Sequence, residues 1–285
     1  MSFWKEKRVW VIGASSGIGE GLVEVLAHSG ARLLISSRNK KRLDHIAEKF
    51  SSSEIQVSDM NLADHTSLEA KTIKAWEIFG GFDAVFLNAG IAVRDWMIET
   101  EVEVEKRLFD VNFWGAVIIT KNILRIKGDQ NQLHLVITSS LSGKYGVPKL
   151  ASYAASKHAL HGYFESLRAE IYGKGISIHL VIPGFINTEI TVNGLRGDGT
   201  VSGKMQTALA KGMDPVTCAR GILKGVQEGK EEFVVGGMER HTVWLSRLFP
   251  RFMKKMIRSN PIQKLEKWKH LFRKKSGPKP LSDQN

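Results

Sequence analysis

Short apolar runs alternate with longer amphipathic segments along most of the chain. Most of these runs are apolar at every position, as strands buried on both faces of a sheet should be. Because a segment with helical spacing follows nearly every run, the pattern predicts an α/β protein. The predicted strands are Arg8–Gly13, Arg32–Ser36, Glu54–Ser58, Ala84–Asn88, Leu133–Ser139, Ile176–Ile182 and Phe233–Gly236.

Amphipathic segments long enough for helices fill the intervals between the strands. This alternation predicts a doubly wound, Rossmann-type parallel sheet with helices on both faces. The predicted helices are Ile18–Ser29, Lys40–Phe50, Ser67–Phe79, Val102–Ile126, Tyr153–Tyr172 and Pro215–Glu228. We expect one domain over residues 1–237 and an amphipathic helical extension over residues 238–285, ending in a disordered segment rich in polar residues and proline.

Three glycines directly follow the first predicted strand and precede a helical pattern, with the spacing Gly-x-x-x-Gly-x-Gly. Glycines let the chain turn tightly and let backbone amides approach a pyrophosphate, and a helix N-terminus attracts phosphate. A bare strand–helix turn would not need three glycines, so the loop predicts a nucleotide site. The candidate contacts are Gly13, Ser15, Ser16, Gly17, Ile18 and Gly19.

The end of the second predicted strand carries basic residues and no acid until Asp44. An acid at this point would bind the ribose 2′-hydroxyl of NAD. Arg38 can instead make a forked contact with a 2′-phosphate, and Ser37 is small enough to admit it. Lysines at the following helix start oppose the helix dipole, which favours an anion partner over a solvated surface. The sequence therefore favours NADP(H) over NAD.

Tyr153 and Lys157 stand four positions apart in a predicted helix, so both project from one face. An ammonium one turn away favours the phenolate and should lower the tyrosine pKa from its ordinary value of about 10. Such a pair also arises by chance on helices, so its surroundings decide how it is interpreted. Other strand ends deliver small or polar groups to the same carboxyl edge of the sheet, where open sheets bind ligands. These groups are Asn88-Ala89-Gly90, Ser139 with Ser140, and Pro183-Gly184 leading to Thr188.

Six motifs together resemble the short-chain dehydrogenase/reductase superfamily in its common form. They are GASSGIG (13–19), LNAG (87–90), Asn112 in DVNFWGA, SSLSGKYG (139–146), YAASK (153–157) and PGFINT (183–188). The resemblance implies an NADP(H)-dependent enzyme that transfers a hydride between the nicotinamide and a carbonyl or alcohol. A sensor or scaffold that binds NADP without turnover is the alternative, and it would need only the glycine loop.

The resemblance also implies individual roles. Tyr153 is then the acid/base at the substrate oxygen, Lys157 tunes Tyr153 and bonds the nicotinamide ribose, and Ser140 polarises the substrate oxygen. Asn112 holds a water in the proton relay. The implied cofactor contacts beyond the glycine loop and the basic residues are Asn61, Leu62, Asn88, Ala89, Gly90, Tyr153, Lys157, Pro183, Ile186 and Thr188.

Several positions depart from the family pattern. Ile12 replaces the usual threonine before the first glycine, and Leu87 replaces the first asparagine of the Asn-Asn-Ala-Gly motif. Asn61 fits best the slot of the adenine-contacting aspartate, because an amide oxygen can still accept from the adenine amino group. Asp59 is the competing candidate.

The formal net charge of +12 lies almost wholly in the extension, since residues 1–239 are close to neutral. One cysteine and nine histidines occur without ligand spacing, so we expect no metal site. Residues 189–212 carry five glycines and should form a mobile cover over the substrate. The sequence shows neither a signal peptide nor a transmembrane run, and we expect a cytoplasmic protein that is not secreted.

The extension combines apolar and basic residues at helical spacing over residues 244–258, and Pro250 is placed to start a second helix. The pattern is typical of an interfacial helix on an anionic membrane. The alternative is that the apolar stripe packs on the body or on a second subunit. We expect a lipophilic carbonyl or alcohol substrate, a homodimer or homotetramer, and no nucleic-acid partner.

Overall fold

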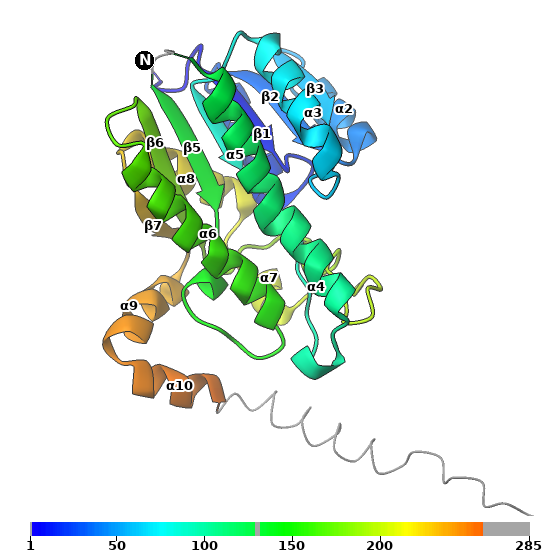
Figure 1. Cartoon of the computed structure of the whole chain (residues 1–285), viewed down its shortest axis with the longest axis vertical. Helices are drawn as coiled ribbons and strands as arrows, with labels where there is room; N and C mark the ends of the chain where they lie inside the picture. The colour runs from blue at the N-terminus through cyan, green and yellow to red at the C-terminus, as the bar shows by residue number, and fades with distance from the viewer. Residues whose placement is uncertain (1, 129–131, 259–285) are drawn as a thin grey trace, which may run out of the picture. The chain divides into compact units, whose positions relative to one another are not determined.

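A seven-stranded, all-parallel sheet forms the centre of the protein, with strand order β3-β2-β1-β4-β5-β6-β7 (Figure 1). The computed structural model describes residues 2–128 and 132–258. The strands are β1 (Arg8–Ile12), β2 (Arg32–Ser37), β3 (Ile55–Asp59), β4 (Ala84–Leu87), β5 (Leu133–Thr138), β6 (Ile176–Pro183) and β7 (Glu232–Val235). The order reverses between β1 and β4, which is where a doubly wound sheet opens its crevice. The predicted fold class is confirmed.

Helices cover both faces of this sheet, close to the predicted positions. In chain order, the helices of the described residues are α1 (Gly17–His28), α2 (Lys40–Lys49), α3 (His65–Ile78), α4 (Val102–Phe109), α5 (Gly115–Ile126), α6 (Ala151–Glu170), α7 (Thr207–Ala210), α8 (Pro215–Gln227), α9 (His241–Leu248) and α10 (Pro250–Arg258). The single helix predicted over 102–126 is interrupted by a π-helical turn, η2 (Asp110–Trp114), which hydrophobic spacing did not reveal. The sequence analysis also did not predict α7.

Two apolar layers, one on each face of the sheet, make up most of the core. Successive residues of β1 alternate between them: Val9 and Val11 pack with α1, α2 and α8, whereas Trp10 and Ile12 pack with α3, α5 and α6. This explains why the strands are apolar throughout. Cys218 is buried in the first layer on α8, and burial raises its thiol pKa to about 12, so it behaves as a small apolar residue.

Side-chain caps mark two of the helix starts. Asn39 accepts a hydrogen bond from the Arg42 backbone N–H at the start of α2. Asp214 does the same for Thr217 at the start of α8, where Pro215 occupies the first turn. Polar side chains at these positions satisfy helix N–H groups that have no partner within the helix.

The chain separates into two compact units, residues 1–243 and 244–285. The predicted boundary at residue 237 lies a few residues earlier. Pro250 begins α10, as its position predicted. Within the described ranges, no helix combines the length and hydrophobicity needed to cross a bilayer.

The half-buried His134 of β5 pairs with the buried His179 of β6, away from the carboxyl edge of the sheet. His134 Nδ1 lies 2.9 Å from His179 Nε2, and His179 Nδ1 lies 2.6 Å from the Lys230 carbonyl oxygen. Because a carbonyl can only accept, His179 carries its proton on Nδ1 and accepts from His134 at Nε2. Burial, reinforced by the neighbouring His179, lowers the pKa of His134 to about 4.

This pair should make folding stability depend on pH. The depressed pKa means that the folded state favours neutral His134, so its contribution is present above about pH 6.5 and is lost as pH falls toward 4. Replacing His134 by Asn keeps an N–H donor near the Nδ1 position but removes the titration. We expect the loss of unfolding free energy between pH 7.5 and 5 to be about 1 kcal/mol smaller in His134→Asn, measured by urea unfolding.

The surface variant His45→Asn provides the matched control, because His45 is exposed on α2. An equal pH dependence in wild type and His134→Asn would contradict the proposed neutral pair.

Candidate functional site

The glycine loop lies where β1 and β4 end side by side. Gly13 has a φ of +86°, and a Cβ there would lie 2.5 Å from the Cα of Ala89. Gly17 has a φ of +57°, and its Cβ would lie 2.8 Å from Thr188 Cγ2. The Asn88 side-chain amide donates to the Gly13 carbonyl at 3.2 Å. The structure therefore brings three of the predicted cofactor-binding segments into direct contact.

A cavity of about 570 Å³ opens beside this loop. Ser15, Ser16, Gly17 and Thr188 of the predicted cofactor set line one part of it. Asn193 and Met205, from the glycine-containing segment predicted to cover the substrate, also line it. A second cavity, of about 780 Å³, has Arg32 and Glu54 among its lining residues and contains none of the predicted site residues. Of these two cavities, only the smaller is therefore lined by predicted cofactor-binding residues.

The basic residues after β2 do not share one environment. Arg42 pairs with Glu20 at 3.1 Å, and Lys40 pairs with Asp44 at 2.8 Å. Arg38 is exposed and has no ion-pair partner among the residues that the structure describes. Ser37, just before it, is buried and accepts from the Asn39 backbone N–H at 3.1 Å. Arg38 is thus available to an anionic ligand.

The two candidates for the adenine contact differ in the partners they already have. Asp59, at the end of β3, pairs with Lys71 at 2.7 Å, and this bond holds the pKa of its carboxyl below the usual value. Asn61 is exposed, and its amide oxygen accepts from the Ala63 backbone N–H. Leu62 is buried, and a Cβ at Gly115 would lie 2.7 Å from its Cβ. Asn61 is therefore the freer of the two candidates.

Tyr153, Ser140 and Lys157 meet between the end of β5 and the first turns of α6. The Ser140 side chain lies within reach of the Tyr153 phenol and favours its ionised form. Lys157 is 3% exposed, and its ammonium donates to the Thr138 carbonyl at 2.9 Å. Its nitrogen lies 5.9 Å from the centroid of the Tyr153 ring. This arrangement brings together the three predicted catalytic side chains.

Burial dominates the electrostatics of this group. It raises the pKa of Tyr153, although the Ser140 hydrogen bond acts in the opposite direction. Burial also lowers the pKa of Lys157 to about 8. The expectation that Lys157 would bring the Tyr153 pKa below its ordinary value is wrong for this structure, because desolvation of the phenolate is the larger effect.

Asn112 lies in the middle of the π turn η2 and is 2% exposed. Its amide oxygen accepts from the Ile91 N–H at 2.8 Å, and its amide nitrogen donates to the Ile91 carbonyl at 2.9 Å and to Ser156 Oγ at 3.2 Å. A Cβ at Gly90 would lie 3.3 Å from the Asn112 amide oxygen and 3.5 Å from the Lys157 ammonium. The fourth predicted catalytic residue is therefore a neighbour of Lys157.

The segment after β6 carries the last predicted contacts. Pro183 ends the strand, and Ile186 is 3% exposed and forms a backbone bridge with Met213. Glu239 fixes this segment, because its carboxylate accepts from the N–H groups of Phe185 and Gly237, both at 2.9 Å. The sequence analysis missed Glu239, and no motif around it signals the role.

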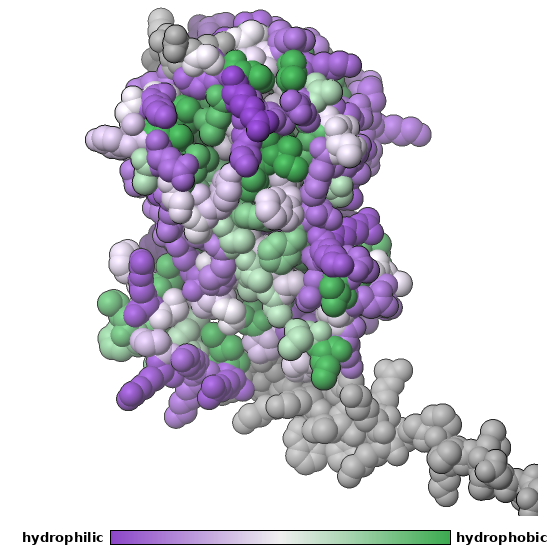
Figure 2. Space-filling model, in the orientation of Figure 1, coloured by the Kyte–Doolittle hydropathy of each residue, from purple (hydrophilic) through white to green (hydrophobic). Residues whose placement is uncertain are grey.

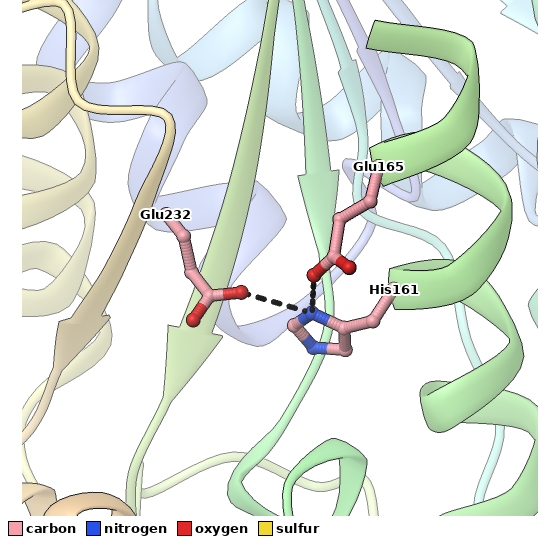
Figure 3. Close-up of side chains that lie close together, drawn as sticks. All are labelled: His161, Glu165 and Glu232. Atoms are coloured by element: carbon pink, nitrogen blue, oxygen red, sulfur yellow. Dashed lines mark ion pairs between the residues drawn. The ribbon is translucent and has the colours of Figure 1, made fainter. Parts of the chain in front are cut away.

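A cluster behind the predicted catalytic group was also missed. His161 on α6 lies 3.2 Å from a Glu232 oxygen and 3.8 Å from a Glu165 oxygen through Nδ1 (Figure 3). Its Nε2 lies 2.8 Å from Ser139 Oγ. Such a trio of side chains could hold a metal ion, although we had expected no metal site. This cluster could not be predicted from local spacing, because Glu232 comes from a strand far from His161 along the chain.

Comparison with known proteins identifies the relatives of this chain. The family model for short chain dehydrogenases matches residues 7–197. A zebrafish (Danio rerio) protein named dehydrogenase/reductase SDR family member 7B is 32% identical over 86% of this chain and 82% of its own. The Bos taurus protein of the same name is 32% identical over 92% of this chain and 83% of its own.

Solved structures share the fold. A short chain dehydrogenase/reductase from Burkholderia phymatum in complex with NAD aligns with a TM-score of 0.76 at 20% identity, over 87% of this chain and 95% of its own. An alcohol dehydrogenase from Thermococcus sibiricus complexed with 5-hydroxy-NADP aligns with a TM-score of 0.68 at 23% identity, over 81% and 97%.

Proposed function

Since the chain belongs to the short-chain dehydrogenase/reductase family, we propose that it is an NADP(H)-dependent carbonyl reductase or alcohol dehydrogenase whose catalytic set is Tyr153, Lys157, Ser140 and Asn112. The observation that carries this proposal is the group at the carboxyl edge of the sheet that the half-buried Ser140 and Tyr153 form with the buried Lys157. A binding module without turnover would need the glycine loop but not this group.

The cofactor-binding loop fits a dinucleotide, because Gly13 and Gly17 leave the space and the backbone angles that a pyrophosphate site needs. A bound NADP(H) supplies or accepts the hydride. The chain supplies the proton: the Tyr153 phenol gives it to the carbonyl oxygen during reduction, while Ser140 bonds the same oxygen. The raised pKa keeps Tyr153 protonated near neutrality, which suits the reductive direction.

Lys157 has a different part in this proposal. With a pKa of about 8 it stays mostly protonated near pH 7, and the Thr138 carbonyl fixes the direction of the ammonium. From that position it can bond the nicotinamide ribose and stabilise a phenolate as the proton leaves Tyr153. Asn112 completes the set by holding the π turn against Ile91, next to Lys157.

Removing the phenol hydroxyl tests the acid/base role. We expect Tyr153→Phe to abolish NADPH oxidation while NADPH binding stays near normal, because the ring and helix are kept and only the proton donor is lost. A screen of steroid, retinal, acyl and quinone carbonyls provides the substrate for this assay. Tyr163→Phe, on the same helix, is the matched control. More than a tenth of wild-type turnover in Tyr153→Phe would contradict the acid/base role of Tyr153.

Cofactor preference tests Arg38. We expect NADPH to bind more tightly than NADH and Arg38→Asp to narrow or reverse the difference. A charge-assisted phosphate contact contributes roughly 1.5–3 kcal/mol, or about ten- to a hundredfold in affinity. Titration of nicotinamide fluorescence measures both constants. Lys41→Asp makes the same charge change at the exposed neighbouring helix start and should leave the difference unchanged. Equal affinities of the wild type for NADPH and NADH would contradict the proposed contact between Arg38 and the 2′-phosphate.

We also propose that the enzyme is cytoplasmic and that residues 244–258 bind it to an anionic membrane surface, where a lipophilic substrate would be found. Large apolar side chains are exposed there: Trp244, Leu248, Phe249, Phe252 and Met256. Five basic residues accompany them: Arg247, Arg251, Lys254, Lys255 and Arg258. Figure 2 shows hydrophobic and strongly hydrophilic side chains next to each other over α9 and α10. A homodimer or homotetramer is proposed as well, on the resemblance to the family alone.

Vesicle binding tests the membrane proposal. Full-length protein should co-sediment with phosphatidylserine vesicles at low salt and be released as salt rises. Each basic residue contributes about 1 kcal/mol of binding free energy at an anionic surface. Salt weakens this attraction, because the screening length falls to about 8 Å near physiological ionic strength. The paired variants Phe249→Ser with Phe252→Ser, and Lys254→Glu with Lys255→Glu, should each weaken binding. Protein that stays in the supernatant at low salt would contradict the proposal.

A further inference from the structure

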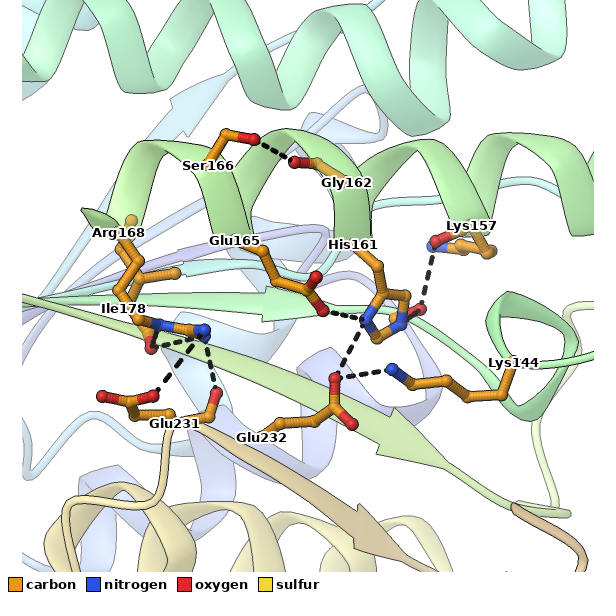
Figure 4. Close-up of polar contacts among 11 residues, drawn as sticks. Lys144, Lys157, His161, Gly162, Glu165, Ser166, Arg168, Ile178, Glu231 and Glu232 are labelled. Carbon is orange, nitrogen blue, oxygen red and sulfur yellow. Dashed lines mark hydrogen bonds and ion pairs between the residues drawn. The ribbon is translucent and has the colours of Figure 1, made fainter. Parts of the chain in front are cut away.

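His161 stands on the same face of α6 as Tyr153 and Lys157, one turn beyond the lysine. Its side chain is buried and lies between Lys157 and Glu165 on the α6 side and Glu232 on the other (Figure 4). Nε2 lies 2.8 Å from Ser139 Oγ. Ser139 is 3% exposed and directly precedes Ser140, so it has no access to a substrate of its own. His161 therefore reaches the proposed catalytic group through Ser139.

Ser139 connects the two elements that carry the proposed catalytic residues. Its hydroxyl lies 3.4 Å from the Lys157 carbonyl oxygen on α6, and its backbone N–H donates to the Val181 carbonyl at 2.8 Å. Gly143 closes over this contact, because a Cβ there would lie 2.5 Å from Ser139 Oγ and 3.1 Å from His161 Nε2. The end of β5 and the first half of α6 are thus joined at one hydroxyl.

Glu232 holds the other side of the imidazole. One carboxylate oxygen lies 3.2 Å from His161 Nδ1 and 2.6 Å from the Lys144 ammonium. Lys144 belongs to the loop that follows Ser140. The contact with His161 is the largest influence that lowers the Glu232 pKa, to about 2. Among the described residues Nδ1 has no partner with hydrogen-bond geometry, so the Glu232 carboxylate acts on it as a nearby negative charge. That charge favours a proton on Nδ1, and Nε2 is left to bond Ser139.

A metal ion is the competing explanation for the trio of His161, Glu165 and Glu232. The Lys144 ammonium already contacts the Glu232 carboxylate, and the Glu165 side chain is half exposed. Both observations favour an internally neutralised ion network over a cation site.

We propose that His161, oriented by Glu232, is a positioning residue that fixes the Ser139 hydroxyl and thereby aligns Ser140 with Lys157. This inference rests on the proposed reductase function. The network also ties Lys144, after Ser140, to β7, so it braces both sides of the serine.

A double-mutant cycle on turnover tests the inference. We expect His161→Leu to lower kcat by about tenfold with little change in the KM for NADPH, within the range of coupling between residues of one network. Ser139→Ala should have a similar effect, and the double variant should be no slower than either single variant. His161→Gln, whose amide can still bond Ser139, should recover most of the loss, whereas Glu165→Gln should leave kcat unchanged.

Independent, multiplicative losses of kcat in the double variant, or full activity in His161→Leu, would overturn the inference. An increase in Tm with micromolar Zn²⁺ that disappears in Glu165→Gln would also overturn it, in favour of a metal site.

Wild-type turnover is measured first, so that failure of the proposed reductase function can be told apart from failure of the proposed positioning role of His161. If the wild type binds NADPH but turns over no carbonyl, the proposed function fails. The same cycle is then judged by melting temperature: non-additive Tm shifts support the Ser139–His161 coupling, and additive shifts overturn it. His161→Gln provides this readout even if His161→Leu does not fold.

Discussion

The burial of one ammonium group constrains the whole candidate site. Lys157 is almost fully removed from solvent, and a buried charge is tolerated only where hydrogen-bond partners replace water. The Thr138 carbonyl is such a partner, which fixes the distance between the end of β5 and the second turn of α6. Gly90 lies on another side of the ammonium, where a Cβ would come into van der Waals contact with it at 3.5 Å. The placement of Tyr153 and Ser140 follows from this arrangement.

Sequence reasoning could reach the fold because burial imposes a simple pattern. A strand covered on both faces must be apolar along its buried length. The sequence of β4, and that of β1 after Arg8, shows this without any long-range information. The glycine loop and the Tyr153–Lys157 pair are also local, because their spacing along the chain already fixes their geometry. Asn112, in contrast, was predicted only from the resemblance to a family, because its spacing from the other site residues does not place it near them.

Contacts between distant segments were out of reach. Glu232 meets His161, and Glu239 meets Phe185, through the packing of whole elements, and neither acid lies in a recognisable motif. The pKa of Tyr153 was misjudged for a related reason: the nearby lysine can be inferred from spacing, whereas the depth of burial that outweighs it depends on the assembled core. Position along a chain predicts neighbours better than it predicts solvation.

The π turn at Asp110–Trp114 restricts insertions and deletions between α4 and α5. A π turn holds one residue more than the α-helical turn it replaces, so the side chains before and after it are out of phase by about 100°. Accordingly, Val104 and Leu108 of α4 belong to a small cluster of their own, whereas Ile119 and Ile123 of α5 belong to the main layer. Loss of a single residue here would turn one of these helices by a quarter turn, so the length of the segment is constrained as tightly as its composition.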